Sequence, residues 1–181
     1  MLYTDPHFLD RGACREIRRA MDAGAVESAE ILHGAIEQRD HIRRASYVDV
    51  EAAVLEDVEA RLDARRHAIG AFFGIALQAR EGAGFVRYPD GGFYRPHRDR
   101  ADVPSWPDAA RRRIAVVVFL NSSREADREG DFDGGVLRML EHEPLEIPPR
   151  EGTLVAFAAD ALHEVTRVRN GTRDAIVDWY Y

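Results

Sequence analysis

The chain has 181 residues and a formal net charge of −7, with 45% hydrophobic and 31% charged residues. This length and balance fit one globular domain with its own core and a charged surface. The acidic charge argues against a general nucleic-acid or anionic-membrane partner, which leaves proteins, peptides and small molecules as candidate partners. The oligomeric state stays open.

The first residues, Met-Leu-Tyr-Thr-Asp-Pro-His, contain no basic region followed by an apolar run. Nor does the chain contain the stretch of about 20 apolar residues that a membrane span needs. The single cysteine, Cys14, excludes an internal disulfide, so we expect a cytoplasmic protein in a reducing compartment. Because Cys14 lies in a helical pattern, we interpret it as a packed residue rather than a nucleophile.

Residues 1–80 are expected to be a mainly helical support. Asp10 can cap a first helix that runs to about Met21. A second helix is expected over Glu51–Phe72, where apolar residues recur at helical spacing. Arg43–Val50 lies between the two helices and reads as a strand. We interpret the helices as a layer that covers a sheet.

Short β-runs separated by Gly and Pro turns begin near residue 84. The expected strands cover residues 84–88, 92–98, 112–120, 136–140, 143–147, 153–158, 162–169 and 174–180. Arg113–Leu120 is almost continuously apolar and reads as a central strand buried on both faces. Many short strands indicate a sandwich or barrel, and helices followed by strands indicate one α+β domain.

His97 and Asp99 are candidate metal ligands, because side chains two residues apart on a strand share one face. A distant strand could supply His163 as the third ligand. Two imidazoles and one carboxylate bind Fe(II) on one side and leave positions open for a chelating cosubstrate and O₂. Arg173 follows His163 by ten residues, and its guanidinium could hold the far carboxylate of 2-oxoglutarate.

An isolated His-x-Asp pair is weak evidence, because it also occurs in polar surface strands. Here it is accompanied, in order, by Tyr88-Pro-x-Gly-x-x-Tyr94, Phe119-Leu-Asn121, Gly134-Gly-Val-Leu-Arg138, His163-Glu-Val165, Thr172-Arg173 and Trp179-Tyr180. With these motifs the chain resembles the prolyl 4-hydroxylase and hypoxia-sensing prolyl hydroxylase type of 2-oxoglutarate/Fe(II)-dependent dioxygenase. The resemblance covers Phe85 to Tyr181 closely and the N-terminal part loosely.

The resemblance implies a double-stranded β-helix, or jelly-roll, over residues 84–181, with the N-terminal helices bracing its major sheet. It implies that Fe(II) is bound by His97, Asp99 and His163. It also implies that Arg173 binds the C5 carboxylate of 2-oxoglutarate, with Tyr88 near this cosubstrate. O₂ would be the second cosubstrate and ascorbate the reductant. Beyond the metal site, no catalytic side chain is required.

The implied activity is hydroxylation of an unactivated C–H bond, coupled to decarboxylation of 2-oxoglutarate to succinate and CO₂. A prolyl residue of a protein or peptide is the first substrate hypothesis, by analogy with the family. The alternative is a free amino acid or a small biosynthetic metabolite. A non-catalytic cupin-like metal or ligand binder is a second alternative, although such a binder would not need Arg173 as a cosubstrate anchor.

Phe119 departs from the family pattern, which usually has tyrosine just before the Leu-Asn pair to help hold 2-oxoglutarate. The absent hydroxyl would remove one hydrogen bond, worth about 0.5–1.5 kcal/mol net. We expect the Arg173 ion pair to dominate cosubstrate binding nonetheless.

Five residues flank the expected metal site and are candidates for contact with the substrate: Tyr94, Arg95, Trp106, Arg138 and Trp179. Trp106 belongs to the apolar, proline-containing loop Arg100–Arg111, which could act as a lid or substrate wall. Alternatively, Trp106 packs on the barrel, and Arg95 and Arg138 form exposed salt bridges. The other histidines lack a ligand pairing and are expected at the surface; they are His7, His33, His41, His67 and His142.

Overall fold

The computed structural model describes residues 1–28, 31–32, 36–37, 41–102, 106–141 and 143–181. Within these ranges the helices are α1 (Arg11–Ala23) and α2 (Ala52–Phe73), and a 3₁₀ turn covers Pro107–Ala110. The strands before α2 are β1 (Leu2–Asp5), β2 (Val26–Ser28), β3 (Ile31–Leu32), β4 (Ile36–Glu37), β5 (Arg43–Arg44) and β6 (Ser46–Val48). The strands after α2 are β7 (Gly84–Tyr88), β8 (Phe93–His97), β9 (Ile114–Phe119), β10 (Asp133–Gly134), β11 (Leu137–Met139), β12 (Leu145–Ile147), β13 (Leu154–Ala158), β14 (His163–Val165), β15 (Val168–Arg169) and β16 (Arg173–Tyr180). Neither helix in these ranges combines the length and apolar character needed to cross a membrane.

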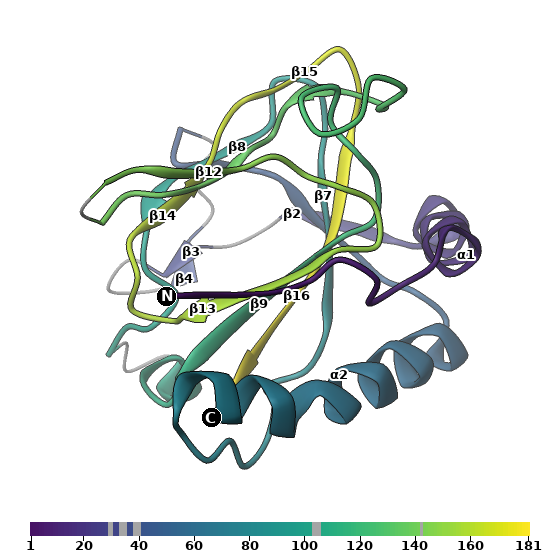
Figure 1. Ribbon diagram of the computed structural model, residues 1–181. Coiled ribbons are helices and arrows are strands. Elements are labelled where there is room, and N and C mark those ends of the chain that lie inside the picture. Colours follow the sequence, from purple (N-terminus) through teal and green to yellow (C-terminus); the bar gives the residue numbers. More distant parts are fainter. Residues whose placement is uncertain (29–30, 33–35, 38–40, 103–105, 142) are drawn as a thin grey trace.

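Two antiparallel sheets face each other and form the body of the molecule (Figure 1). The major sheet has the order β1-β13-β9-β16-β7-β6-β2, and the minor sheet has the order β12-β11-β14-β8-β5. The pairs β10-β15 and β3-β4 are the remaining described strand pairs. Helix α2 runs along the outside of the major sheet, and α1 packs on the same side (Figure 1). The expected α+β jelly-roll with bracing helices is thus confirmed.

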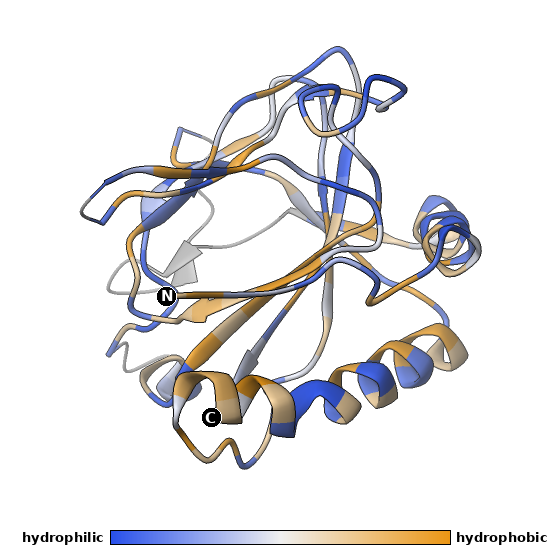
Figure 2. Cartoon of the chain, viewed as in Figure 1, coloured by the Kyte–Doolittle hydropathy of each residue, from blue (hydrophilic) through white to orange (hydrophobic). Residues whose placement is uncertain are grey.

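Strand β9 shows why the major sheet carries a layer on each face. Ile114, Val116 and Val118 belong to the core that the sheet shares with α1 and α2. The residues between them belong to a second core, between the two sheets. All six residues of β9 are buried, as the sequence predicted for a central strand. Hydrophobic colouring follows this strand (Figure 2).

Helix α1 begins as the sequence predicts. The carboxylate of Asp10 accepts a hydrogen bond of 2.9 Å from the backbone N–H of Ala13. Cys14 on this helix is fully buried, and burial together with Glu151 raises the pKa of its thiol to about 12. The thiol is therefore neutral and packed, as interpreted from the helical pattern.

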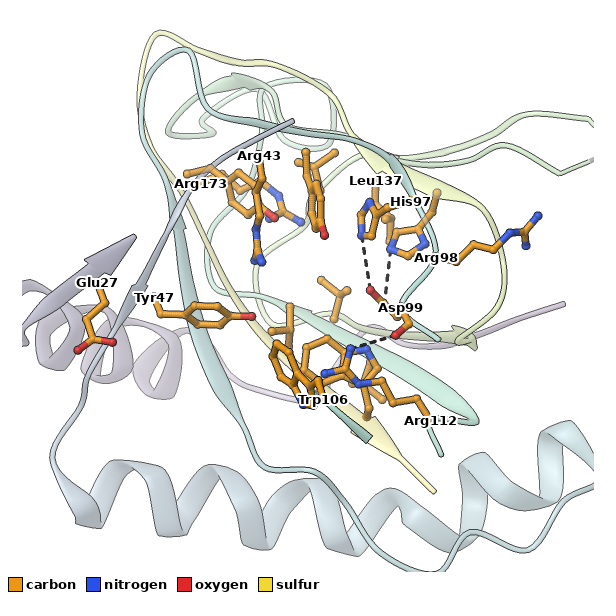
Figure 3. Close-up of a pocket in the computed structure, with 18 residues that line it drawn as sticks. Glu27, Arg43, Tyr47, His97, Arg98, Asp99, Trp106, Arg112, Leu137 and Arg173 are labelled. Atoms are coloured by element: carbon orange, nitrogen blue, oxygen red, sulfur yellow. Dashed lines mark hydrogen bonds and ion pairs between the residues drawn. The ribbon is translucent and has the colours of Figure 1, made fainter. Parts of the chain in front are cut away.

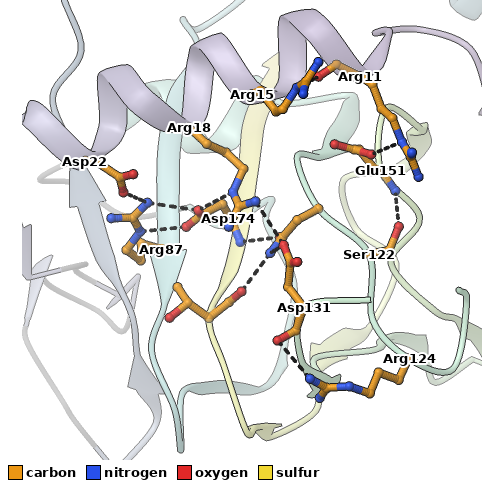
Figure 4. Close-up of polar contacts among 12 residues, drawn as sticks. Arg11, Arg15, Arg18, Asp22, Arg87, Ser122, Arg124, Asp131, Glu151 and Asp174 are labelled. Carbon is orange, nitrogen blue, oxygen red and sulfur yellow. Dashed lines mark hydrogen bonds and ion pairs between the residues drawn. The ribbon is translucent and has the colours of Figure 1, made fainter. Parts of the chain in front are cut away.

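A buried carboxylate ties α1 to the major sheet (Figure 4). Asp174 on β16 has a fully buried side chain and accepts hydrogen bonds from Arg18 Nε at 3.1 Å and Arg87 Nε at 2.7 Å. Arg18 belongs to α1 and Arg87 to β7, so one carboxylate joins three elements. Arg87 also binds Asp22 at the end of α1, at 2.8 Å.

The predicted strand Arg43–Val50 is wrong in one respect, because two strands occupy it. Arg43–Arg44 pairs with β8 in the minor sheet, whereas Ser46–Val48 pairs with β7 in the major sheet. The chain crosses between the sheets at Ala45, so one short extended segment contributes a strand to each sheet. The predicted strand 162–169 is likewise divided, into β14 and β15.

Strands β1, β2, β3, β4 and β10 were not predicted, and β1 shows why. It is an edge strand whose main support is its pairing with β13, from Leu2 opposite Phe157 to Asp5 opposite Leu154. Such a partner is distant in sequence and leaves no local pattern. Three other predictions lie outside the described residues: the surface positions of His33 and His142, and the part of the proposed loop at 103–105.

Candidate active site

The two candidate histidine ligands face each other across neighbouring strands of the minor sheet. His163 on β14 pairs in register with His97 on β8, and their ring centroids are 4.1 Å apart. Asp99 lies two residues beyond the end of β8. Its carboxylate oxygens are 3.5 Å from His97 Nε2 and 3.7 Å from His163 Nε2 (Figure 3). The sequence therefore predicted the convergence of these three side chains correctly.

The backbone sets the orientation of both imidazoles. His97 Nδ1 lies 2.8 Å from the carbonyl oxygen of Arg95, and His163 Nδ1 lies 2.9 Å from that of Ala161. A protonated Nδ1 donates to each carbonyl, which leaves the Nε2 lone pair directed at the shared centre. In both cases the acceptor is two residues earlier: Arg95 lies in β8 with His97, and Ala161 lies in the turn just before β14.

Electrostatics favour the protonation states that a metal ligand needs. Burial, followed by the neighbouring imidazole of His97, lowers the pKa of His163 to about 4, so its ring is neutral near pH 7. Burial alone would raise the pKa of Asp99, but His163 and His97 together hold it well below its usual range. The site thus presents a neutral imidazole at His163 beside the carboxylate of Asp99.

The donor atoms of His97, Asp99 and His163 all lie within 4.8 Å of one another. Among the residues that the structure describes, this is the single group of His, Cys, Asp or Glu side chains arranged to hold a metal. Two nitrogens and one carboxylate on one side of an ion match the facial triad of non-haem Fe(II) oxygenases, which leaves coordination positions open for other ligands. The side chains therefore fit Fe(II).

Arg173 lies in the same cavity, which has a volume of about 500 Å³ and lies between the two sheets (Figure 3). The residue is 2% exposed, and its Nε has no hydrogen-bond partner. In the described part of the chain no carboxylate forms a salt bridge with it, and burial lowers its pKa. A buried cation without a protein counter-charge is costly, so this end of the cavity fits an anionic ligand such as the far carboxylate of 2-oxoglutarate.

Two aromatic rings and a glycine shape the surroundings of Arg173. Its guanidinium carbon lies 4.9 Å from the ring centre of Tyr88 and 5.4 Å from that of Phe119. Phe119 thus occupies the position expected for a cosubstrate-binding tyrosine, without the hydroxyl. A Cβ on Gly135, which has φ +60°, would lie 2.8 Å from Arg173 Cδ, so this glycine leaves room for the arginine.

Asn121 fixes the backbone on both sides of Arg173. Its Nδ2 donates to the carbonyl of Thr172 at 2.9 Å, and its Oδ1 accepts from the N–H of Asp174 at 3.0 Å. In the sequence, Asn121 was recognised only as part of the motif Phe119-Leu-Asn121. This positioning contact spans 51 to 53 residues of sequence, so no local pattern could have indicated it.

The cavity brings together most of the predicted substrate residues. Tyr94, Trp106 and Trp179 line it, as does Tyr88. Two predicted residues lie elsewhere: Arg95 is exposed and donates to the carbonyl of His41 at 2.7 Å, and Arg138 pairs with Glu146 at 2.7 Å and Glu164 at 2.9 Å. His7, His41 and His67 are exposed, as expected.

Sequence reasoning missed Arg43, Tyr47 and Arg112, which also line the cavity. Arg43 and Tyr47 come from the segment before α2, which was interpreted only as a strand. Arg112 lies between two indoles, with its guanidinium carbon 3.7 Å from the ring centre of Trp179 and 5.0 Å from that of Trp106. The clustering of arginines in Arg111-Arg-Arg113 just before the central strand is the one sequence signal that could have drawn attention to it.

Comparisons with known proteins agree with this geometry. A family model described as the 2OG-Fe(II) oxygenase superfamily matches residues 83–181. A PKHD-type hydroxylase from Acidovorax ebreus is 25% identical over 99% of this chain and 77% of its own length. Another PKHD-type hydroxylase, from Maricaulis maris, is 30% identical over 79% of this chain and 72% of its own length.

Solved structures give the same result. The crystal structure of a Pseudomonas putida prolyl-4-hydroxylase is similar with a TM-score of 0.75 and 26% identity, covering 99% of this chain and 91% of that one. A prolyl hydroxylase from Trichoplax adhaerens, in complex with a hypoxia inducible factor peptide fragment, shares the fold with a TM-score of 0.78 and 19% identity, covering 99% of this chain and 83% of that one. The chain therefore belongs to the 2OG-Fe(II) oxygenase superfamily and is a prolyl hydroxylase-like, 2-oxoglutarate-dependent dioxygenase.

Proposed function

We propose that this protein hydroxylates a prolyl residue of a protein or peptide, with 2-oxoglutarate and O₂ as cosubstrates. The observation that carries the oxygenase chemistry is the pairing, within one cavity, of the His97, Asp99 and His163 cluster with the buried cation of Arg173. The prolyl assignment is supported by the likeness to prolyl hydroxylases, one of which is in complex with a peptide fragment. Aromatic walls from Tyr94, Trp106 and Trp179 suit the apolar face of a proline ring.

In this proposal His97, Asp99 and His163 hold Fe(II), and Arg173 holds the C5 carboxylate of 2-oxoglutarate. The bound iron supplies the oxidative chemistry that couples decarboxylation of 2-oxoglutarate, to succinate and CO₂, with insertion of one oxygen atom of O₂ into a C–H bond. The chain itself supplies position and exclusion of water. Arg173 fixes one end of the cosubstrate, and Asn121 fixes the backbone that carries Arg173.

Aromatic side chains pack against both histidine ligands. The ring of Tyr94 stacks on His97, with centroids 3.4 Å apart and planes inclined by 15°. Phe157 contacts the ring of His163 edge-on, at 4.7 Å between centroids. These contacts restrict rotation of the imidazoles and keep water from one side of the site. The protein can therefore contribute by holding the metal ligands in position, and it need not supply an acid or a base.

The test is turnover of 2-oxoglutarate in the presence of Fe(II), O₂ and ascorbate, across prolyl peptides, free amino acids and small metabolites. We expect peptide-dependent succinate formation, and a peptide product that gains one oxygen atom at proline by mass spectrometry. A His97→Ala variant is the matched negative control. Stimulation by a free amino acid or metabolite, with none by prolyl peptides, would replace the proposal with the small-molecule alternative. Omission of ascorbate tests its proposed role as the reductant.

A further inference from the structure

Asp99 is held differently from the two histidine ligands. His97 and His163 lie on β8 and β14, where they pair with each other in register, whereas Asp99 follows the last residue of β8 by two positions. The backbone N–H of Asp99 donates to the carbonyl oxygen of Ala159 at 2.9 Å. Because β8 ends before this residue, contacts other than strand pairing must keep its carboxylate at the metal site.

Arg112 supplies such a contact on the carbonyl side of Asp99. Its Nη1 donates a hydrogen bond of 3.0 Å to the backbone carbonyl oxygen of Asp99 (Figure 3). Arg112 lies two residues before β9, the buried central strand of the major sheet. The residue that carries the third ligand is thus tied to both sheets, through β8 on one side and through Arg112 on the other.

The guanidinium of Arg112 is itself held in one orientation. Its Nε and Nη2 bind the two carboxylate oxygens of Glu81, at 2.6 and 2.5 Å. Its guanidinium carbon lies 3.7 Å from the ring centre of Trp179. Arg112 is only 2% exposed, so water screens this ion pair little, and a bidentate pair of this kind is both strong and directional. The fork on Glu81 therefore keeps Nη1 directed at Asp99.

Glu81 is anchored in turn at the end of β16. Its backbone N–H donates to the carbonyl oxygen of Trp179 at 2.9 Å. Its carboxylate Oε2 accepts a hydrogen bond of 3.2 Å from the hydroxyl of Tyr181. A continuous series of polar contacts therefore runs from the end of the central sheet, through Glu81 and Arg112, to the backbone of Asp99.

We propose that Arg112, held by Glu81, is a positioning residue for the metal. It fixes the backbone of Asp99 so that the carboxylate stays beside the two imidazoles before the metal binds. A ligand that is already in place loses less conformational freedom on binding, and the affinity for the metal is correspondingly higher. This inference rests on the proposed function, in which Asp99 is one of the three residues that hold Fe(II).

The experiment measures the Kd for Mn(II) by electron paramagnetic resonance, together with thermal melts of the metal-free protein. Arg112→Gln and Glu81→Gln should each raise this Kd by about 10–100-fold, as for other losses of groups that orient metal ligands. Arg112→Lys should give a value between those of Arg112→Gln and the wild type, because lysine keeps the charge but lacks the planar fork.

Arg80→Gln is the matched control for a loss of stability alone. Arg80 directly precedes Glu81 and forms a buried ion pair of 2.6 Å with Asp178. It also binds Asp63 of α2 at 3.2 Å, so this pair lies on the helix side of the major sheet, away from the cavity. Arg80→Gln should lower the melting temperature, as Arg112→Gln does, and leave the Kd for Mn(II) unchanged.

Wild-type affinity for Mn(II) in both Arg112→Gln and Glu81→Gln would overturn the positioning role. An equal loss of affinity in Arg80→Gln would also overturn it, because the effect would then be one of general stability. If Arg112→Gln does not fold, Glu81→Gln and Arg112→Lys still decide between these outcomes.

The positioning role and the proposed function fail differently. If the variants weaken Mn(II) binding but no prolyl peptide gains oxygen with Fe(II), the prolyl function fails and the positioning role stands. If prolyl peptides are hydroxylated while Mn(II) affinity does not depend on Arg112, the positioning role fails and the prolyl function stands. A wild-type protein that bound no Mn(II) would overturn both.

Discussion

Arg173, which we propose as the cosubstrate anchor, illustrates how a residue that binds a ligand can destabilise the ligand-free fold. Its charge is buried, and no carboxylate among the described side chains forms a salt bridge with it. Leaving a charge without its partner in a protein interior typically costs about 3–5 kcal/mol, whereas an apolar side chain of similar volume is often tolerated or stabilising. The unliganded protein therefore carries a strain that an anionic ligand relieves.

Arg173→Met should separate the two roles. We expect the melting temperature of the ligand-free protein to stay the same or rise, because the buried charge is gone. Affinity for 2-oxoglutarate should fall by about a hundredfold or more, as for the loss of one partner of a buried ion pair. Thermal melts and calorimetry measure the two quantities. An unchanged affinity would place the cosubstrate anchor at another residue.

His97→Ala should remove metal binding while the fold remains. Changing the outer partners of metal ligands typically costs about 10–100-fold in affinity or activity, so loss of a ligand should cost at least about a hundredfold. Mn(II) binding by electron paramagnetic resonance and succinate formation are the measurements. His67→Ala, on an exposed face of α2, is the control and should behave as wild type. Normal metal affinity in His97→Ala would contradict the assignment.

At the scale of elements, the buried carboxylate of Asp174 holds α1 against the major sheet. Its partners Arg18 and Arg87 keep side-chain exposures of 31% and 24%, so they are partly solvated. Asp22 contacts the same Arg87 but has 66% side-chain exposure. The two carboxylates thus share Arg87 as a partner, but Asp174 is buried and also binds Arg18, whereas Asp22 is exposed.

Asp174→Asn should lower the free energy of unfolding by roughly 2–4 kcal/mol, somewhat less than for a fully buried pair. Asp22→Asn should cost no more than about 1 kcal/mol, as for an exposed ion pair. Urea unfolding monitored by circular dichroism gives both values. Similar costs for the two variants would mean that burial of Asp174 is not what stabilises the contact.

Trp106 connects the loop after Asp99 to the cavity wall through Arg112. We expect Trp106→Ala to raise the KM for a prolyl peptide. The binding of Mn(II) and 2-oxoglutarate should stay intact, because the indole is neither a metal ligand nor part of the proposed cosubstrate site. Thermal melts, measured together with peptide kinetics, distinguish a substrate-binding role of Trp106 from a purely structural one. A large fall in melting temperature with unchanged kcat/KM would show that Trp106 only packs on the barrel.

For the whole molecule, ligands that bind only the folded state should stabilise it. Each ligand at about a hundred times its Kd adds about 2.7 kcal/mol, or roughly 5–10 °C in a domain of this size. Mn(II) and 2-oxoglutarate together should therefore raise the melting temperature, and a chelator should reverse the effect. Stabilisation by 2-oxoglutarate that did not depend on the metal would indicate a cosubstrate site away from the three ligands.

The sequence was informative where function depends on local spacing. His97 and Asp99, with the motifs around them, predicted the ligand cluster, and the apolar run before Leu120 predicted the central strand. It was uninformative where a contact joins distant segments. Nothing around Arg43 indicates that it faces Tyr94, because that contact arises only when β5 pairs with β8. Likewise, the space that Gly135 leaves for Arg173 exists only in the assembled fold.

The position of β16 has a consequence for biosynthesis. This strand lies between β9 and β7 in the middle of the major sheet, yet it follows every other described element in the chain. A ribosome therefore releases both neighbours before the strand that joins them, and β7 and β9 expose unpaired edges until then. Since β16 also begins with Arg173, a nascent chain that ends before this residue lacks the buried cation of the cavity. Folding that depends on such distant pairing is slow, so the nascent chain is a natural client for factors that protect exposed strand edges.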